Sequence, residues 1–376
     1  MWLRVRPGSQ MIIHAPAFTQ TGNETLVSAR IQLRTKRRGV PSELWFRFTG
    51  TARVSADADP FVVALLLLAM QNDEPIEIRG TLSRKLFNGL QQYQHVYHSW
   101  FPDRFKMIEI RPEGLREDVT QEAAGAACAF SGGVDSFYTL LALRSQVTHA
   151  IFMAGFDMPL NLTDSIGELV RSYSTMMKDF RINLIVGSTN VRNFVNSVDW
   201  TNAHGQALAA TALFYKDSWS KFYIPSSYSL DNYPKWGSHP SLDHLLSTES
   251  LQLIHHGAHA NRVRKLETVS KAPESYDRLR VCWIQDIGLR NCGECEKCIR
   301  TMVALDILGK LPRYSTFGPR KKLNRHKVRQ LMPRTHQARL FARELMREAV
   351  RRGKYLNFFD LGYSLLRREL FYRSLT

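Results

Sequence analysis

Residues 125–142 read GAACAFSGGVDSFYTLLA, which is a short apolar run, a pair of glycines and an apolar run of helical length. The first run predicts a buried strand and the last a helix. Two glycines let the backbone between them turn tightly and point successive N–H groups at an anion. The helix adds its dipole and its own unpaired N–H groups at the same place. The stretch therefore predicts an anion-binding turn. The alternative is a plain strand-to-helix turn, in which Asp135 and Ser136 only cap the helix.

Strands and helices alternate on the C-terminal side of this turn. Apolar runs of strand length occur at residues 148–154, 182–188 and 221–227, and helical segments separate them at 164–180 and 204–219. This alternation is typical of a parallel sheet that is covered by helices on both faces. We therefore expect an α/β fold with a doubly wound parallel sheet. Ligands bind beyond the carboxyl ends of the strands in such sheets, and the glycine turn lies at one of those ends.

Three segments are expected along the chain. Residues 1–118 mix strand and helix patterns, including a helical run at 59–72 that begins with an aspartate as its cap, and form a small α+β domain of unknown role. Residues 125–311 form the catalytic domain. Residues 320–376 form a basic helical extension. The expected linker, at residues 114–125, is rich in charged and small residues.

The positive charge of the chain is concentrated in its last part. The formal net charge is +17, and residues 320–376 hold 16 Lys and Arg against 4 Asp and Glu, a net +12. Such a segment can bind nucleic acid or a partner protein; the alternative is a solvated basic face of surface helices. The longest apolar run, at residues 61–70, is too short to cross a bilayer, and no signal peptide is recognisable. We expect a cytoplasmic protein without membrane contact, and the sequence leaves its oligomeric state open.

Four of the five cysteines are crowded together in the sequence. Cys282 is followed by Cys292, Cys295 and Cys298, and the last three are spaced three residues apart. Thiolates at this spacing can face one ion, and four of them complete a tetrahedral zinc shell, so the site should be structural. An iron–sulfur cluster or unliganded cysteines are the alternatives. Cys128, inside the strand before the glycine turn, is expected to be a buried core residue.

The glycine turn resembles the SGGxDS signature of the PP-loop ATP pyrophosphatases. The resemblance implies cleavage of ATP between its α- and β-phosphates, transfer of AMP to a substrate oxygen and release of pyrophosphate. The turn would position ATP and neutralise the leaving pyrophosphate. Ser131 and Ser136 would donate hydroxyls to phosphate oxygens, and Asp135 would hold a Mg²⁺ ion that bridges them. The expected cofactor-binding residues are Phe130, Ser131, Gly132, Gly133, Val134, Asp135 and Ser136, and the expected catalytic residues are Ser131, Asp135 and Ser136.

Together with the cysteines, the turn resembles the 7-cyano-7-deazaguanine synthase (QueC-like) family, whose cysteines bind zinc. The resemblance covers residues 125–309, roughly half of the chain. It implies a sheet of the HUP (adenine nucleotide alpha hydrolase-like) class and a ligase that forms C–N bonds. Such an enzyme adenylates a deazaguanine carboxylate, and a nitrogen nucleophile then gives the amide and finally the nitrile, as in queuosine biosynthesis. In relatives from bacterial modification and antiviral gene clusters, the activated group can pass to a macromolecule instead.

The chain departs from that family around the expected acceptor site. The family carries a Tyr-Pro-Asp-Cys-Arg-like stretch where this sequence has Tyr233-Pro234-Lys235-Trp236-Gly237, and an Arg-Asn pair where it has His204-Gly205. A site that hydrogen-bonds one heterocycle discriminates through such polar groups, so the acceptor is expected to differ. Two other functions stay open. One is RNA modification such as thiolation, which needs a catalytic cysteine pair near the ATP site. The other is a nucleotide-binding regulatory subunit without turnover.

Several further residues carry weaker expectations. Asp157 follows an apolar strand, from which a carboxylate can reach ribose, metal or substrate. His239 and His244 lie in the loop over the expected site. We interpret His255, His256 and His259 as exposed polar residues, because no carboxylate pattern accompanies them, and Trp200, Trp219 and Trp236 as packing residues.

Overall fold

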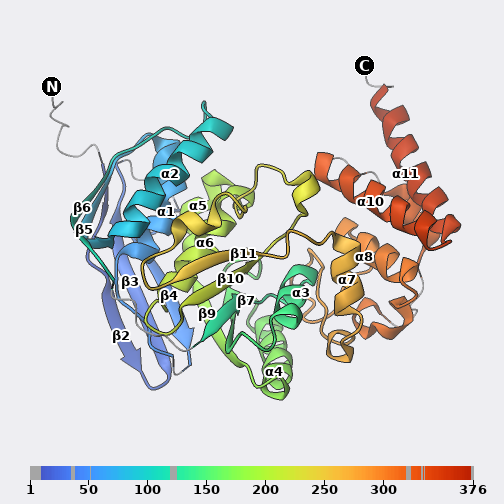
Figure 1. Cartoon of the computed structure of the whole chain (residues 1–376), viewed down its shortest axis with the longest axis horizontal. Helices are drawn as coiled ribbons and strands as arrows, with labels where there is room; N and C mark the ends of the chain where they lie inside the picture. The colour runs from blue at the N-terminus through green and yellow to red at the C-terminus, as the bar shows by residue number, and fades with distance from the viewer. Residues whose placement is uncertain are drawn as a thin grey trace.

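The computed structural model describes residues 10–34, 39–50, 52–118, 125–318, 323–331, 333 and 335–373 (Figure 1). Its strands are β1 (Met11–Ile13), β2 (Ala17–Thr21), β3 (Glu24–Gln32), β4 (Glu43–Thr49), β5 (Ile76–Ser83), β6 (Ile110–Arg116), β7 (Ala126–Ala129), β8 (His149–Ala154), β9 (Asn183–Thr189), β10 (Lys221–Pro225) and β11 (Gln252–His256). Within the described residues they form one mixed, mostly parallel sheet of 11 strands in the order β11-β10-β7-β8-β9-β4-β3-β1-β5-β6, with β2 paired to β3.

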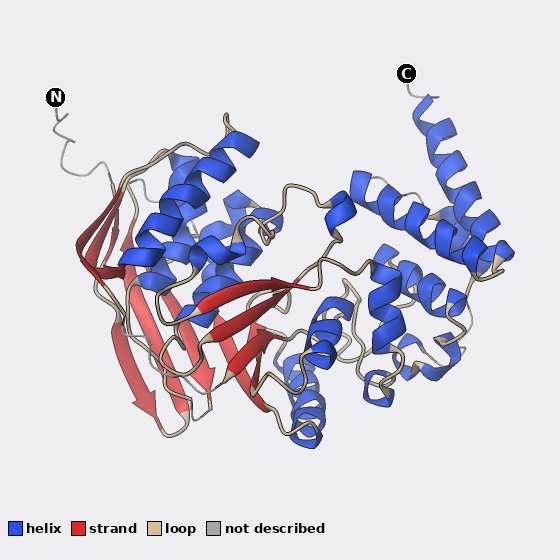
Figure 2. Ribbon diagram, in the orientation of Figure 1, coloured by secondary structure: helices blue, strands red, loops and turns tan. Residues whose placement is uncertain are grey.

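Some helices pack against this sheet, and others lie beyond it at one end of the molecule (Figure 2). They are α1 (Asp59–Asn72), α2 (Arg84–Trp100), α3 (Val134–Ala142), α4 (Thr163–Asp179), α5 (Val191–Val195), α6 (Trp200–Leu213), α7 (Arg262–Val269), α8 (Glu296–Ile307), α9 (Arg325–Gln330), α10 (His336–Arg351) and α11 (Tyr355–Arg373). Short 3-10 turns lie at η1 (Asn196–Val198), η2 (Leu230–Asn232), η3 (Asp243–Leu246), η4 (Pro273–Ser275), η5 (Leu311–Arg313) and η6 (Ser315–Phe317). The expected α/β class is therefore confirmed. Among the helices in the described ranges, none combines the length and the apolar character that crossing a membrane requires.

The strands from β7 to β11 form an all-parallel half of the sheet, in the order β11-β10-β7-β8-β9. The chain enters this half in its middle at β7, builds outward to β9, and then returns to the other side of β7 with β10. The strand order therefore reverses between β7 and β10. In open α/β sheets, ligands bind at such a switch point, beyond the carboxyl ends of the strands. The turn that begins at Ser131 follows β7 and lies at this point.

Both faces of the parallel half are buried. Side chains of successive strand residues point to opposite faces of a sheet. In β7, Ala127 and Ala129 enter the core that includes α1 and α6, whereas Ala126 and Cys128 enter the core that includes α3, α4, α7 and α8. Such two-sided burial explains the continuous apolar runs in the sequence and is compatible with a doubly wound sheet.

The N-terminal segment continues the same sheet. β4 pairs antiparallel with β9, with Phe48 opposite Gly187, and β3, β1, β5 and β6 follow outward. The core is also continuous across this junction. Phe214, which follows α6, packs against Phe46 of β4 and Phe61 of α1, with ring centroids 4.9 and 5.6 Å apart. The N-terminal segment and the parallel half therefore share one sheet and one core.

Asp59 is not the cap of α1, contrary to expectation. It is the first helical residue, and the residue before it, Ala58, makes no side-chain cap. The Asp59 carboxylate instead accepts the Ser83 N–H at 3.1 Å and pairs with Arg116. It thus ties the start of α1 to the ends of β5 and β6.

Other boundaries also differ from the sequence expectation. Residues 114–116, expected in a linker, continue β6 and pair with β5 beyond a register shift between Ile78 and Thr81. α6 begins at Trp200, so His204 lies inside the helix and does not start it. β11 was not expected at all, because its last two residues are histidines and its apolar run is short.

The described part of the C-terminal segment is helical. Asn324 and Thr335 cap α9 and α10 by accepting the N–H groups of Lys327 and Ala338. Gly353, with a φ of +66°, connects α10 to α11. In Figure 1, α10 and α11 lie near α7 and α8, at the end of the molecule opposite β5 and β6. Arg320 and its neighbours, where the expected extension begins, lie outside the described residues.

Candidate functional site

The turn between β7 and α3 is held in shape by its own hydrogen bonds and by a close neighbour. Gly132 has a φ of +76°, and a Cβ at this position would lie 1.8 Å from the Tyr173 Oη. Glycine is therefore required both for the backbone conformation and for the space. The Ser131 N–H donates to Ser136 Oγ at 3.2 Å, and this hydroxyl donates to the Gly133 carbonyl at 3.0 Å.

Apart from that of Ser131, the N–H groups of the turn have no acceptor among the described residues. Within the described parts of the chain, no atom accepts a hydrogen bond from the N–H groups of residues 132–136. The first N–H groups of a helix have no partner within the helix, and no side chain caps these ones, so they are free to bind a ligand. These groups lie at the N-terminus of α3, where the helix dipole favours an anion.

The side chains of the turn divide into two kinds. Phe130 is 2% exposed and packs against Phe137 and Tyr173, so its side chain belongs to the core. The Ser136 hydroxyl is buried and is used inside the turn, whereas Ser131 is exposed. The predicted residues 130–136 thus lie in one turn, and Ser131 offers the more accessible hydroxyl.

Asp135 forms ion pairs with two cations of α7. Its Oδ2 lies 3.2 Å from Arg262 Nη2, and its Oδ1 lies 3.0 Å from Lys265 Nζ. Lys265 also donates to the Ser226 carbonyl, just beyond β10. Burial raises the pKa of the Asp135 carboxyl, but the charges of Arg262 and Lys265 lower it by a larger amount. The pKa therefore lies below its usual value. Asp135 is therefore a carboxylate that holds two cations in place.

This arrangement does not fit a Mg²⁺ ion held by the protein at Asp135. Both carboxylate oxygens already pair with cations, so a metal ion would have to displace Arg262 or Lys265. In the part of the chain that the structure describes, the only group of three or more potential metal ligands is the cysteine cluster. Magnesium at a nucleotide is commonly held by one or two carboxylates together with phosphate oxygens, but neither Asp135 oxygen is free for this role. The expected magnesium role of Asp135 thus has no support in this geometry.

Four cations gather near Asp135. Arg262 and Lys265 come from α7, and Lys297 and Arg300 come from α8. Burial, and then the charge of Arg262, lower the pKa of Arg300 to about 10. Burial also lowers the pKa of Lys297, although the charge of Asp157 opposes this shift.

Part of this positive charge has no partner. The Arg262 Nε is buried, and no described residue accepts a hydrogen bond from it. Buried donors and charges are costly to leave unpaired. A polyanion beside the glycine turn would supply the missing acceptors.

α10 covers two of these cations. Phe341 lies with its ring centroid 4.1 Å from the Arg300 guanidinium carbon and 5.5 Å from that of Arg262. Its ring also stacks on Tyr228, with centroids 5.5 Å apart and an angle of 18°. Glu344, one turn further along α10, accepts the Val263 N–H at 3.0 Å. The C-terminal segment is therefore part of the site and not a separate appendage.

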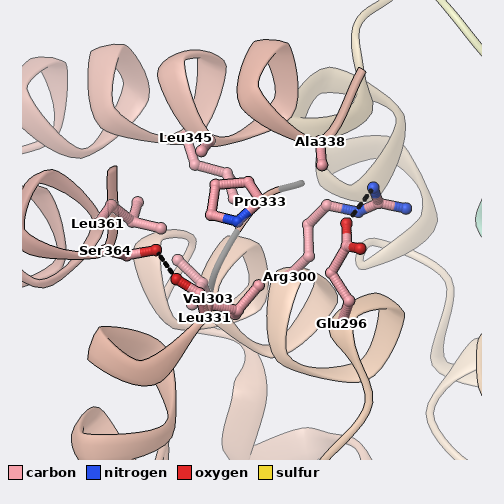
Figure 3. A pocket seen from close by; sticks show the side chains of 10 residues that line it. Glu296, Arg300, Val303, Leu331, Pro333, Ala338, Leu345, Leu361 and Ser364 are labelled. Carbon is pink, nitrogen blue, oxygen red and sulfur yellow. Dashed lines mark hydrogen bonds and ion pairs between the residues drawn. The ribbon is translucent and has the colours of Figure 1, made fainter. Parts of the chain in front are cut away.

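A small cavity lies beside this contact, between α8, α10 and α11 (Figure 3). Most of its lining is apolar and includes Val303, Leu345 and Leu361. Glu296 and Arg300 lie on one side of it, 3.5 Å apart. Because its walls are mainly apolar, we place the anion site at the glycine turn and not here.

A buried chain of hydrogen bonds supports the loop after β10. His255 Nδ1 lies 2.7 Å from Asp243 Oδ2, and His255 Nε2 lies 2.9 Å from the Tyr233 Oη. Ser238 Oγ donates to the same Asp243 oxygen at 2.7 Å. The His255 side chain is only 5% exposed, which corrects its interpretation as an exposed residue. Its partner Asp243 lies 12 residues earlier in the sequence, too far away to be recognised as part of one pattern.

The other histidines of this region also have protein partners. His256 Nδ1 lies 3.0 Å from Thr139 Oγ1, and His259 Nε2 lies 2.9 Å from the Tyr138 Oη. Burial, and then the charge of His259, lower the pKa of His256 to about 4. His239 packs edge-on against Tyr233, at a centroid distance of 4.6 Å.

A row of aromatic rings extends along the carboxyl ends of the strands. The ring centroids of His204 and Trp236 are 5.6 Å apart, and those of Trp236 and Tyr228 are 5.3 Å apart. At the other end of the row, Trp200 Nε1 donates to Asp157 Oδ1 at 3.0 Å. The Trp236 Nε1 is buried and has no acceptor among the described residues. Trp236 therefore holds an unused buried donor, in addition to its packing contacts.

The four predicted cysteines come together in one cluster, which could hold a metal ion such as zinc. All four Sγ atoms lie within 4.8 Å of one another. The Cys282 and Cys295 sulfurs are 4.0 Å apart, and the Cys292 and Cys298 sulfurs are 3.8 Å apart. A zinc tetrahedron with Zn–S bonds of about 2.3 Å has S···S edges of about 3.8 Å, so the cluster matches that metal.

Backbone N–H groups stabilise the sulfurs as acceptors. The Cys282 Sγ accepts from the Ile284 N–H at 3.3 Å, and the Cys292 Sγ accepts from the Cys295 N–H at 3.2 Å. Such bonds favour thiolates, the form that binds metal. Cys295 is the N-cap of α8, the helix that carries Lys297 and Arg300. A metal at the cysteines would therefore hold the start of the helix that supplies two of the four cations.

The fifth cysteine does not belong to a reactive site. Cys128 is fully buried in β7, and burial raises the pKa of its thiol to about 12. Reactive cysteines are thiolates near neutral pH. Cys128 is therefore not placed to act as a nucleophile.

The sequence did not identify the α7 cations. Arg262 and Lys265 follow β11, in a basic stretch that reads NRVRKLE. The available signal was the position of this stretch after a strand of the parallel sheet, but β11 itself was not predicted.

No protein-family model, no curated protein and no solved structure matches this chain.

Proposed function

We propose that this chain is an ATP-using enzyme of the PP-loop type, which cleaves ATP between its α- and β-phosphates. The observation that carries the proposal is the run of unpaired N–H groups at residues 132–136. It lies at the switch point between β7 and β10, and Arg262 and Lys265 bind the Asp135 carboxylate on the same turn. Two cations against one carboxylate leave an excess of positive charge, which a polyphosphate would match and a neutral ligand would not.

The finer fold assignment belongs to this proposal. The strand order β11-β10-β7-β8-β9 and the position of the turn after the central strand agree with the HUP class that the sequence motif implies. A fold supports many activities, so the order supports only the location of a nucleotide. The chemistry has to come from the side chains at that location.

In the proposed reaction, the turn holds the phosphates and the cations receive the charge that develops on leaving pyrophosphate. The N–H groups of residues 132–136 bind phosphate oxygens, and the exposed Ser131 hydroxyl donates to another. Lys265 and Arg262 stabilise the separating charge, and Asp135 keeps them in position. Preorganised cations in a partly buried site stabilise such charge better than solvent does. Magnesium, if the nucleotide carries it, is bound by phosphates and not by Asp135.

For the acceptor, we propose a carboxylate on a planar ring, as in a deazaguanine-related base. The aromatic row of Trp200, His204, Trp236 and Tyr228 supports this proposal, and the unpaired Trp236 N–H can hydrogen-bond the ring. Attack of the carboxylate on the α-phosphorus gives an acyl adenylate and pyrophosphate. A nitrogen nucleophile, either ammonia or an amine of a macromolecule, then displaces AMP and forms an amide.

The cysteine cluster is proposed to be a structural zinc site. Four sulfur ligands leave no open position for catalysis. Its role would be to fix the N-terminus of α8 and so the positions of Lys297 and Arg300. RNA thiolation is a weaker candidate, because Cys128 is buried and the other four cysteines lie in the cluster.

Exchange of labelled pyrophosphate into ATP tests the proposal. The exchange should require a carboxylate such as 7-carboxy-7-deazaguanine, and addition of ammonium should then give AMP. Lys265→Met should slow the exchange by about 10²-fold or more, as expected for loss of one charge-stabilising group. Lys271→Met is the matched control, because Lys271 is an exposed lysine just beyond α7. Formation of ADP and phosphate without AMP would refute the proposal, and ATP binding without exchange would favour a regulatory subunit.

A further inference from the structure

α11 presents an apolar row to solvent. Its members are Tyr355, Leu356, Phe359, Tyr363 and Leu366, which are 58, 66, 64, 54 and 59% exposed. We call this row the α11 seam. The opposite side of the helix is buried and includes Asn357, Asp360, Leu361 and Ser364, each no more than 3% exposed. A contiguous exposed apolar patch on a folded protein marks an interaction site more often than scattered single apolar residues do.

The spacing of the α11 seam is that of a helix-pairing surface. Leu356, Phe359, Tyr363 and Leu366 are separated by three, four and three residues. This alternation corresponds to the a and d positions of heptads, which place side chains along a narrow line for a second helix. The single line of rings and leucines therefore favours a helix as the occupant.

Buried polar contacts on the other side keep the α11 seam turned outward. Asp360 pairs with Arg325 at 2.8 Å and with Arg329 at 2.6 Å, both from α9. Asn357 Nδ2 donates to Asp306 Oδ2 of α8 at 2.8 Å. Rotating α11 to cover its seam would expose these groups and break their contacts. The seam therefore needs a partner to be covered.

Charge identifies the kind of partner. Lys354 lies exposed before the seam and Arg367 lies exposed at its other end, whereas Arg351 and Arg352 already pair with Glu348 and Glu267. A second copy of this chain, paired in either direction, would bring these cations against one another. A helix with acidic residues beside its apolar line would instead match them at both ends.

We propose that the α11 seam docks an acidic amphipathic helix of a partner protein. The proposal is independent of the proposed enzymatic function, because it uses none of the residues assigned to the nucleotide. α10 contacts both α11 and the helices that carry the cations. A partner on the seam would therefore be bound next to the proposed site.

The test uses a fluorescent synthetic helix with leucines at its a and d positions and glutamates beside them. Fluorescence anisotropy should show binding to the full chain that weakens as salt is raised. Phe359→Ser with Tyr363→Ser should weaken it by about tenfold or more. Leu230→Ser, at a 62% exposed leucine outside α11, should leave it unchanged. Because all three side chains are exposed, circular dichroism should show that the variants stay folded.

Three results would overturn the proposal. The first is the absence of binding at about 100 µM acidic helix. The second is equal binding of a helix with lysines in place of the glutamates. The third is binding of the chain to itself, or to anionic phospholipid vesicles, that is lost with Phe359→Ser and Tyr363→Ser while the acidic helix does not compete.

Discussion

Asp135 on the glycine turn and Lys265 on α7 form an ion pair of 3.0 Å between residues that are 130 positions apart in the sequence. The same Lys265 ammonium donates to the Ser226 carbonyl beyond β10. One side chain therefore connects both sides of the switch point, the turn after β7 and the end of β10. Arg262 holds the other Asp135 oxygen, so the position of the turn depends on both cations.

Asp135→Asn should destabilise the fold. It leaves Lys265, whose side chain is 2% exposed, and Arg262 without their carboxylate. Removing one partner of a buried ion pair costs about 3–5 kcal/mol, and the 19% exposure of Asp135 favours the lower end. The double variant with Lys265→Met should recover part of the loss, because one unpaired charge is then gone. Urea unfolding measures all three. If the double variant loses more unfolding free energy than the two single variants lose together, the ion pair is not what stabilises this region.

Gly132→Ala should destabilise the fold much more than an alanine at another glycine of left-handed conformation. Gly132 has a φ of +76°, and its added Cβ would lie 1.8 Å from the Tyr173 Oη. Gly309, with a φ of +66° and nothing within 4 Å of its Cβ, isolates the backbone part of the effect. We expect a cost of about 1–2 kcal/mol for Gly309→Ala, and a larger one with loss of ATP binding for Gly132→Ala. Equal losses in thermal melts would mean that Tyr173 moves aside.

Metal removal should affect both stability and nucleotide binding. Purified protein should contain about one zinc per chain, lost in Cys295→Ser. Because α8 begins at this cluster and carries Lys297 and Arg300, the metal-free protein should also bind ATP more weakly. Metal analysis, thermal melts and ATP titrations check the three statements. Cys128→Ala is the control for metal content, since that thiol lies in β7 outside the cluster. If the metal-free protein binds ATP with unchanged affinity, the cysteine cluster does not support the proposed nucleotide site.

The parts of the site that the sequence predicts are local. Residues 130–136 and the three cysteines after residue 291 each lie in one short segment with a fixed spacing. Their chemistry can be predicted from the sequence, because an anion-binding turn or a metal-binding cysteine segment needs few contacts with distant residues. The alternation of apolar runs likewise predicts β7, β8, β9 and β10, whose apolar side chains are largely buried, but not β11.

The remainder depends on contacts between distant segments. Arg262 and Lys265 become site residues only because α7 packs beside a turn more than 120 residues earlier. β11 ends in His255 and His256, and two polar residues at the end of a short apolar run do not indicate a strand. The strand forms because β10 pairs with it and because Asp243 and Thr139 contact its two histidines. The joining of β4 to β9 is an edge pairing between strands, for which the sequence carries no local signal.

Acid should weaken the fold partly through His256. Burial lowers the pKa of this group to about 4 in the folded chain, from about 6.5 in an unfolded one. Between these values the unfolded state binds the extra proton, so this contribution to stability is present above pH 6.5 and is lost as the pH falls toward 4. His256→Gln should therefore flatten the change in unfolding free energy between neutral and mildly acidic pH. His95→Gln, at an exposed histidine of α2, should keep the wild-type slope. An unchanged slope in both variants would assign the acid sensitivity to other groups.

The contact of Phe341 with two arginines makes a prediction about the C-terminal segment itself. Its ring lies 4.1 Å from Arg300 and 5.5 Å from Arg262, where the ring face attracts a cation by about 0.5–2 kcal/mol. Phe341→Leu keeps an apolar side chain of similar size but removes this attraction, so both guanidiniums should be less ordered when a polyphosphate arrives. We expect the Kd for ATP to rise about three- to tenfold, together with a modest loss of thermal stability, because the Phe341 ring is buried. Phe359→Leu, on the exposed side of α11, is the matched control and should bind ATP as the unmodified chain does. Isothermal titration measures the affinities. If Phe341→Leu binds ATP normally, α10 covers the cations without positioning them, and the proposed nucleotide site is complete without the C-terminal segment.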